Sequence, residues 1–157
     1  MGPTFAWRLD TAVHARTWDS GIGAMKGGGR WNPLGFAAVY CSLDPSTAIL
    51  EVAVHKGFDT LDRVAHTLTS CEMINPATLH VVTAATLPNA RWLENGPPSR
   101  GQQEFGRKTL EEHGAMVIPS AVCQQSWNFI FSPAHFTSRY VLQHQSAFSL
   151  DTRLSPP

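Results

Sequence analysis

Three consecutive glycines, Gly27 to Gly29, stand directly before Arg30 and a short apolar stretch, and this order limits the folds open to the chain. The stretch from Phe36 to Ser42 has the composition of a buried strand. In a dinucleotide-binding Rossmann unit the glycine turn follows a strand and leads into a helix. Here the glycines precede the strand, so the sequence argues against a doubly wound parallel fold.

A helix with clear start signals follows this strand. Asp44 suits the N-cap position and Pro45 suits the first helical position, so we expect a helix over residues 46–55. Within it, Glu51 is the single acid in the otherwise apolar stretch 48–54. Such a glutamate either faces solvent, as on an ordinary surface helix, or serves a functional site.

The remaining elements are mostly short strands separated by loops. Apolar or alternating runs predict these strands at residues 5–9, 64–71, 79–83, 115–122, 127–131 and 148–150. A second helix is expected over residues 102–113, with Gly114 as its stop signal. Three segments are expected to be loops, the last of them a mobile surface loop: 10–25, 57–62 and 88–101. Strands outnumber helices and do not alternate with them, which predicts an α+β fold with a mainly antiparallel sheet.

Length, charge and cysteine content narrow the class of protein. The 157 residues suit one domain, 1–157, with 151–157 as a fraying tail. Twelve basic residues balance twelve acidic ones, so no overall field attracts nucleic acid or a membrane surface. Cys41, Cys71 and Cys123 lack a C-x-x-C spacing, and no apolar run approaches the roughly 20 residues that span a bilayer. We therefore expect a soluble cytoplasmic protein that has no metal site and binds neither nucleic acid nor membrane directly.

Two arginines are candidates for binding an anion. Arg30 ends the glycine turn, where backbone amides can approach a ligand and a planar guanidinium suits phosphate or carboxylate. Arg8, between Trp7 and Leu9 in the first expected strand, is a second candidate. The alternative for either arginine is a surface ion pair worth under about 1 kcal/mol.

Several motifs together resemble those of the RES-domain family, the toxin half of toxin–antitoxin pairs, which is named for an Arg, a Glu and a Ser. The motifs are Gly28-Gly29-Arg30-Trp31-Asn32, Val39-Tyr40-Cys41-Ser42 and Ala48-Ile49-Leu50-Glu51. Arg30 and Glu51 match the first two residues of the name. Ser120 best matches the third, although Ser126 lies close enough to compete. Ser132-Pro133 departs from the family, which usually has Asn-Pro at that place.

The resemblance implies an ADP-ribosyltransferase-like fold with two small, mainly antiparallel sheets and a few helices around an NAD cleft. It also implies a toxin of a type II toxin–antitoxin system that depletes cellular NAD+ by hydrolysis or phosphorolysis of the nicotinamide–ribose bond. An alternative within the family is mono-ADP-ribosylation of a specific protein. NAD+ would be a substrate rather than a cofactor. An Xre-type helix-turn-helix antitoxin would block the site, in a complex that can contain a toxin homodimer.

The resemblance assigns roles to particular side chains. Glu51 would stabilise the positive charge that develops on the ribose as nicotinamide leaves, and Arg30 would bind the pyrophosphate or the adjoining ribose. The residues expected to contact NAD+ are Arg8, Trp31, Tyr40, Ser42, Ser120 and Asn128. The alternative for Tyr40 and Trp31 is that they pack in the hydrophobic core, as is usual for aromatic residues in apolar stretches.

A function of another class also fits the residues. The chain could be a non-catalytic module whose glycine turn and Arg30 capture a phosphate-bearing ligand or an acidic loop of a partner. Turnover of NAD+ distinguishes this module from an enzyme. A toxin that acts on nucleic acid is disfavoured by the zero net charge and the lack of a basic stripe.

Overall fold

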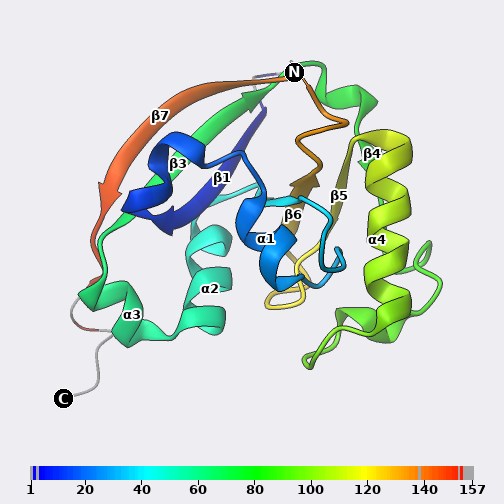
Figure 1. Ribbon diagram of the computed structural model, residues 1–157, viewed down its shortest axis with the longest axis horizontal. Coiled ribbons are helices and arrows are strands. Elements are labelled where there is room, and N and C mark those ends of the chain that lie inside the picture. Colours follow the sequence, from blue (N-terminus) through cyan, green and yellow to red (C-terminus); the bar gives the residue numbers. More distant parts are fainter. Residues whose placement is uncertain (1, 3, 138, 152, 154–157) are drawn as a thin grey trace.

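A mixed seven-stranded β-sheet organises the fold in the computed structural model, which describes residues 2, 4–137, 139–151 and 153 (Figure 1). The strand order is β4-β5-β6-β2-β1-β3-β7. The strands are β1 (Thr4–Thr11), β2 (Val39–Ser42), β3 (His66–Met73), β4 (His80–Val81), β5 (Ala115–Pro119), β6 (Trp127–Phe131) and β7 (Tyr140–Phe148). The helices are α1 (Ile22–Gly27), α2 (Pro45–Lys56), α3 (Phe58–Arg63) and α4 (Arg100–His113), with short 3-10 helices η1 (Ala12–Thr17), η2 (Pro76–Thr78) and η3 (Ala90–Leu93).

The sheet has a weak seam between β1 and β2. These two strands are registered through one pair, Trp7 opposite Ser42, whereas β1 and β3 pair along the whole length of both strands. The strands β4-β5-β6-β2 and β1-β3-β7 therefore form two smaller halves that meet at this pair. The predicted α+β class is confirmed, and the two small sheets expected from the sequence are the two halves of one sheet.

Both faces of the β4-β5-β6-β2 half are covered. Side chains alternate along β5, so Met116 and Ile118 pack with α4 while Ala115 and Val117 join the core on the opposite face. Figure 1 shows α4 lying along this half of the sheet. The opposite core contains an aromatic cluster formed by Trp18, Phe129, Phe131, Phe136 and Tyr140.

The two longest helices begin and end at the residues that signal them. The Asp44 carboxylate accepts a backbone N–H of the first turn of α2 at 2.8 Å, and Pro45 is the first helical residue. Ser99 caps α4 in the same way, and Gly114 ends it with a φ of 79°. The predictions for these two helices are confirmed to within two residues at either end.

The three segments expected to be loops contain helices. Segment 10–25 includes η1 and the start of α1, segment 57–62 forms most of α3, and segment 88–101 includes η3. The unexpected helices in these three segments are only four to six residues long, too short for a hydrophobic period to show. Tertiary packing holds α3 and η3 instead, since Leu61 of α3 and Leu93 of η3 are both buried. The surface-loop prediction for 88–101 is therefore wrong at Leu93.

The strand ends also differ from the prediction. β2 and β4 are shorter than expected, whereas β7 extends over nine residues where only 148–150 was predicted. Because β7 is an edge strand with mostly exposed side chains, it lacks the apolar run that marks a buried strand. The predicted fraying at 151–157 falls mostly outside the described residues.

Gly106 offers a test of how closely α4 packs on the glycine turn. A Cβ at Gly106 would lie 2.0 Å from the carbonyl oxygen of Trp31, whereas the nearest atom to a Cβ at Gly101 would be 3.8 Å away. We expect Gly106→Ala to lower the free energy of unfolding by about 1–3 kcal/mol through overpacking. Gly101→Ala should leave it unchanged or raise it, because alanine favours a helix. Urea unfolding followed by circular dichroism compares the two, and equal midpoints would contradict the close packing.

Candidate functional site

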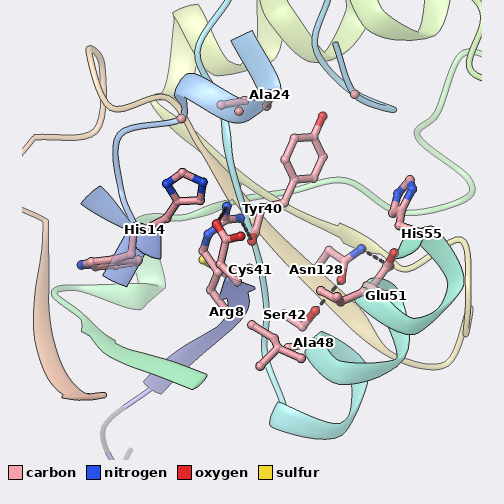
Figure 2. A pocket seen from close by; sticks show the side chains of 18 of the residues that line it. Arg8, His14, Ala24, Tyr40, Cys41, Ser42, Ala48, Glu51, His55 and Asn128 are labelled. Atoms are coloured by element: carbon pink, nitrogen blue, oxygen red, sulfur yellow. Dashed lines mark hydrogen bonds and ion pairs between the residues drawn. The ribbon is translucent and has the colours of Figure 1, made fainter. Parts of the chain in front are cut away.

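A cavity of about 750 Å³ opens between the glycine turn, the β1–β2 seam and α2 (Figure 2). This volume lies within the usual range of small-molecule and cofactor pockets. Seven of the eight residues predicted for the site line it: Arg8, Arg30, Trp31, Tyr40, Ser42, Glu51 and Asn128. The eighth, Ser120, is fully buried and is linked to the cavity by its hydrogen bond to Glu51.

The carboxylate of Glu51 is held on one oxygen. Its Oε1 accepts two hydrogen bonds of 2.7 Å, one from the Ser120 hydroxyl and one from Nδ2 of Asn128. Figure 2 shows the bond from Asn128. Oε2 has no hydrogen-bond partner among the described residues, which leaves one carboxylate oxygen for a bound molecule. The alternative of an ordinary solvent-facing glutamate is therefore wrong.

Ser42 fixes the orientation of Asn128. The two residues stand opposite each other in the β2–β6 register, and Ser42 Oγ donates to Asn128 Oδ1 at 2.8 Å. Because the amide oxygen is taken up by Ser42, the amide nitrogen faces Glu51. Both residues are buried, so water does not compete for these hydrogen bonds. Strand pairing thus sets the geometry of the carboxylate.

Ser120 contacts Glu51 from the turn between β5 and β6. Its Oγ accepts the backbone N–H groups of Val122 and Cys123 at 3.1 and 3.2 Å, so its own proton is left for Glu51. In the described part of the chain, the hydrogen bonds of Ser126 are backbone bonds within the same turn. Of the two candidate serines, Ser120 is the one in contact with Glu51.

The glycine turn is organised around Asn32, a residue for which no role was expected. Asn32 is fully buried, and its Nδ2 donates to the carbonyl oxygens of Ala24 and Phe36 at 2.9 Å each. Its Oδ1 accepts the hydroxyl of Tyr40 at 2.7 Å. A buried amide needs several hydrogen-bond partners, and Asn32 has them within the turn. The sequence signal for this role was a polar residue between a tryptophan and a proline.

Tyr40 and Trp31 meet the cavity in different ways. The Tyr40 hydroxyl donates to Asn32 and accepts the N–H of Trp31 at 2.9 Å, and burial raises the pKa of this phenol well above its ordinary value. Its hydroxyl therefore stays protonated and belongs to the glycine turn. Trp31 is 2 % exposed and packs edge-on against Trp92 and Phe105, so its side chain is mainly part of the core.

Arg30 lines the cavity, but its guanidinium already has partners in the protein. Nη1 donates to the carbonyl oxygens of Trp92 at 3.1 Å and Glu94 at 3.3 Å, and Nη2 donates to that of Gly96 at 3.2 Å. The phosphate contact expected of Arg30 stays a prediction, because these nitrogens bind backbone oxygens here.

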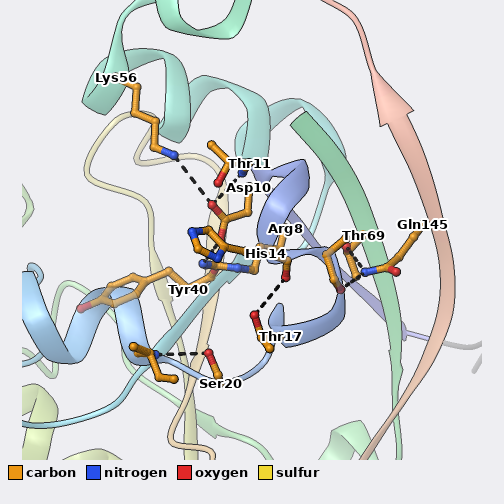
Figure 3. A network of polar contacts seen from close by, with 12 residues as sticks. Arg8, Asp10, Thr11, His14, Thr17, Ser20, Tyr40, Lys56, Thr69 and Gln145 are labelled. Atoms are coloured by element: carbon orange, nitrogen blue, oxygen red, sulfur yellow. Dashed lines mark hydrogen bonds and ion pairs between the residues drawn. The ribbon is translucent and has the colours of Figure 1, made fainter. Parts of the chain in front are cut away.

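Arg8 bridges the seam between β1 and β2 (Figure 3). Nη1 donates to the carbonyl oxygen of Tyr40 at 2.9 Å, and Nη2 donates to Asp10 at 2.6 Å. The ammonium of Lys56 lies 3.7 Å from the other carboxylate oxygen of Asp10. Burial alone would raise the pKa of Asp10, but Arg8, the Thr11 amide and Lys56 together hold it below its ordinary value. Asp10 is therefore ionised near neutral pH. Asp10 and Lys56 both line the cavity, although no sequence pattern pointed to either.

The cavity gathers positive charge in a chain whose formal net charge is zero. The charged residues that line it are four bases and two acids: Arg8, Lys26, Arg30, Lys56, Asp10 and Glu51. Clefts with an excess of one sign of charge concentrate the field that a ligand meets. The cavity therefore favours an anionic ligand even though the whole chain has no net field.

A metal centre finds no support within the described residues. His14 and His55 line the cavity, yet no group of three or more His, Cys, Asp or Glu side chains is placed to hold an ion there or elsewhere in the described chain. None of the described helices combines the length and the apolar character needed to cross a membrane.

The family model of the RES domain matches residues 5–152, nearly the whole chain. The chain belongs to the RES-domain family. Its fold also resembles that of the M. tuberculosis MbcT-MbcA toxin-antitoxin complex, with a TM-score of 0.73 at 19 % identity over 94 % of this chain and 85 % of that one. At this identity the likeness concerns the fold alone, and with the family match it confirms the predicted fold class.

Relatives of this RES domain have toxin names. The chain is 34 % identical over 153 residues to "Toxin Res" of Photorhabdus laumondii, covering 94 % of this chain and 95 % of the relative. It is 31 % identical over 140 residues to the "Prs ADP-ribosylating toxin" of a Sphingobium species, covering 84 % of each. The match to these relatives over most of their length supports the prediction of a RES-family toxin.

Gly29 is a residue of the glycine turn whose replacement by alanine should cause a steric clash. A Cβ there would lie 2.5 Å from both Asn32 Oδ1 and the Tyr40 hydroxyl, whereas a Cβ at Gly27 would meet nothing within 4 Å. We expect Gly29→Ala to lower the free energy of unfolding by about 1–3 kcal/mol, and Gly27→Ala to stay close to the parent. Thermal unfolding of the two variants measures the difference, and a Gly29→Ala protein as stable as Gly27→Ala would contradict this account of the turn.

Tyr40→Phe tests whether the Tyr40 hydroxyl supports the turn. The change leaves the Trp31 N–H and Asn32 Oδ1 without a partner, and each unsatisfied buried group costs about 1–3 kcal/mol. Tyr140→Phe is the matched control, because the Tyr140 hydroxyl makes one hydrogen bond, to Asp19. Urea unfolding should show the larger loss for Tyr40→Phe, and the reverse order would contradict the role given to this hydroxyl.

Proposed function

We propose that this RES domain is a toxin that cleaves the nicotinamide–ribose bond of NAD+. The observation that carries the proposal is the Glu51 carboxylate, which two donors hold on one oxygen at the wall of a cavity with an excess of positive charge. A dinucleotide with two phosphates and a cationic leaving group suits this combination of basic lining and fixed acid. The toxin names of the relatives support the same function.

Bond cleavage would proceed through charge that develops on the ribose. As the bond from C1′ to the nicotinamide nitrogen breaks, its electron pair passes to the ring, which leaves as neutral nicotinamide. C1′ becomes oxocarbenium-like, as in glycoside hydrolysis. Water then adds at C1′ and loses a proton, which gives ADP-ribose. The Oε2 oxygen of Glu51 would supply negative charge beside this centre in the transition state.

The neighbours of Glu51 would act by fixing it before the reaction. Ser120 and Asn128 bind the same carboxylate oxygen, and Ser42 fixes Asn128, so little reorganisation is needed when charge develops. Arg8 and Lys56 would lie near the phosphates, where their positive charges are favourable. The reaction proposed requires NAD+ as substrate and uses no metal or further cofactor.

Glu51→Gln tests the proposal because the amide oxygen of glutamine can still accept the bonds from Ser120 and Asn128. The fold should be kept while the negative charge is lost. We expect nicotinamide release to fall by about 10²–10³-fold, roughly 2.7–4 kcal/mol. The measurement is liquid chromatography of nicotinamide after the purified chain, free of antitoxin, is incubated with NAD+. Glu112→Gln on the exposed side of α4 is the control and should keep full turnover.

The parent protein itself provides the decisive comparison. If the folded protein releases no more nicotinamide than Glu51→Gln, both in buffer with inorganic phosphate and in a cell extract that supplies protein acceptors, the enzyme proposal fails and the non-catalytic binding module is favoured. Calorimetric titration with ADP-ribose would then show whether the cavity still binds a phosphate-bearing ligand.

Transfer of ADP-ribose to a protein is the second candidate, because the name of one relative describes an ADP-ribosylating toxin. The product that contains ADP-ribose identifies which of three acceptors was used. Water gives free ADP-ribose, inorganic phosphate gives a phosphorylated ADP-ribose, and a protein acceptor becomes labelled by NAD+ that has a tagged adenine. Nicotinamide is released in every case, so the acceptor is decided by the second product.

An antitoxin partner forms part of the proposal. A solved structure with the same fold is a toxin–antitoxin complex. We expect an Xre-type helix-turn-helix antitoxin to cover the cavity, in a complex that can contain a toxin homodimer. The cytoplasm, where NAD+ is abundant, is the place where such a toxin would act.

A further inference from the structure

We propose that Trp92 to Gly96 form a strap that positions the glycine turn relative to the β5–β6 turn, held by Arg30 and Gln124. The inference rests on the proposed function and deepens it, because it assigns Arg30 a role in shaping the cavity through the protein backbone. Arg30 is then a positioning residue whose guanidinium acts through the strap.

Three hydrogen bonds connect Arg30 to the strap. Its two terminal nitrogens donate to the carbonyl oxygens of residues 92, 94 and 96 at 3.1, 3.3 and 3.2 Å. A guanidinium presents several N–H groups in a rigid plane and can therefore hold several carbonyls at once, which a lysine ammonium on a flexible stem does less well. Because Arg30 ends the glycine turn, these bonds fix one wall of the cavity to the strap.

Gln124 connects the strap to the other wall. Its Nε2 donates to the carbonyl oxygen of Leu93 at 3.2 Å from the turn between β5 and β6. That turn also contains Ala121, which lines the cavity, and Ser120, which contacts Glu51. The strap therefore joins the segment that ends in Arg30 to the segment that holds the carboxylate.

The strap is itself anchored on α4. Leu93 is 2 % exposed and belongs to the core beneath the helix. Gln102 of α4 donates to the carbonyl oxygen of Trp92 at 3.0 Å, and the Trp92 ring lies 5.7 Å from that of Phe105. A segment held in this way is a fixed reference for both turns, since it is bonded to the helix as well as to the cavity walls.

Gly96 allows the strap to be disturbed from outside the cavity. Its φ of 136° lies in a region that other residues rarely adopt, while a Cβ there would meet nothing within 4 Å. Gly96→Ala should therefore act through backbone strain and move the carbonyl that Arg30 binds. Neither Gly96 nor Gln124 is among the residues that line the cavity. An effect of replacing Gly96 on turnover must therefore be transmitted through the strap, whereas Gln124 also belongs to the turn that contains Ser120.

The first test is the turnover of Gly96→Ala and Gln124→Ala, with Gly101→Ala as the control on the same side of the molecule. We expect kcat for nicotinamide release to fall about 10–100-fold in the first two, as small misplacements of site groups do, with a smaller change in KM. Gly101→Ala should match the parent. If Gly96→Ala and Gln124→Ala keep full kcat while Arg30→Met loses it, Arg30 acts by direct contact and the strap proposal is overturned.

A double-mutant cycle tests whether Arg30 and Gly96 act through the same contact. In an Arg30→Met protein the bond to the Gly96 carbonyl is already absent, so adding Gly96→Ala should lower kcat little further. Fully additive losses would overturn the proposal.

Limited trypsin digestion provides a readout that does not depend on activity. Arg91 precedes the strap and is exposed, so cleavage after it should become faster in Arg30→Met, Gly96→Ala and Gln124→Ala and stay unchanged in Gly101→Ala. If the parent chain does not turn over NAD+, the proposed function fails and this digestion alone decides the strap. Cleavage after Arg91 that is equal in all variants would overturn it.

Discussion

The single registered pair between β1 and β2 is the constraint on which the cavity depends. Where a β-ladder stops, nearby backbone groups need other partners. The carbonyl oxygen of Tyr40 finds one in the guanidinium of Arg8, so a charged side chain from β1 spans the gap. That charge is partly buried and requires a counter-ion, which Asp10 supplies at 2.6 Å. The split in the sheet therefore accounts for the position of Arg8 on the basic side of the cavity, and Arg8 in turn accounts for the counter-ion Asp10.

The polar residues around Glu51 are better explained by orientation than by stability. A typical intramolecular hydrogen bond contributes only about 1 kcal/mol net, and polar groups are costly to bury without partners. Ser42, Asn128 and Ser120 are nevertheless buried together. Ser42 orients Asn128, and Asn128 and Ser120 both donate to Glu51. A buried network of this kind restricts side chains to one arrangement. The arrangement fixes one oxygen of Glu51 and leaves the other to the cavity, which is the property that electrostatic catalysis requires.

Sequence patterns predicted the parts of the fold that short-range interactions determine. The helices α2 and α4 were predictable because caps and stop signals lie within a few residues of their ends. The strand β7 was largely missed, since an exposed edge strand needs no apolar run. The helix α3 was missed because it is short and is held by packing against distant residues.

For the candidate site, the sequence indicated which residues take part but not which residues lie next to them in the fold. Family motifs pointed to Glu51 and Ser120, but their contact joins residues 69 positions apart, which no local pattern contains. Arg30 was recognised as a guanidinium suited to oxygen acceptors, but both carbonyl and phosphate oxygens accept its hydrogen bonds. Only the fold shows that backbone carbonyls of residues 92–96 lie within its reach. Asp10 and Lys56 were overlooked because their importance comes from lying beside Arg8.

The distribution of charge in this chain favours a small anion in the cavity over a long polyanion. At physiological ionic strength exposed charges are screened beyond about 8 Å, so a small ligand in the cavity responds to the charged groups that line it and little to the rest of the surface. Those groups give a formal excess of two positive charges, four bases against two acids, although the whole chain has none. A long polyanion such as RNA is attracted by basic residues spread along its path, and the zero net charge of this chain supplies no overall field that would attract it. The same composition that disfavours nucleic acid is therefore compatible with a compact anion of the size and charge of a dinucleotide.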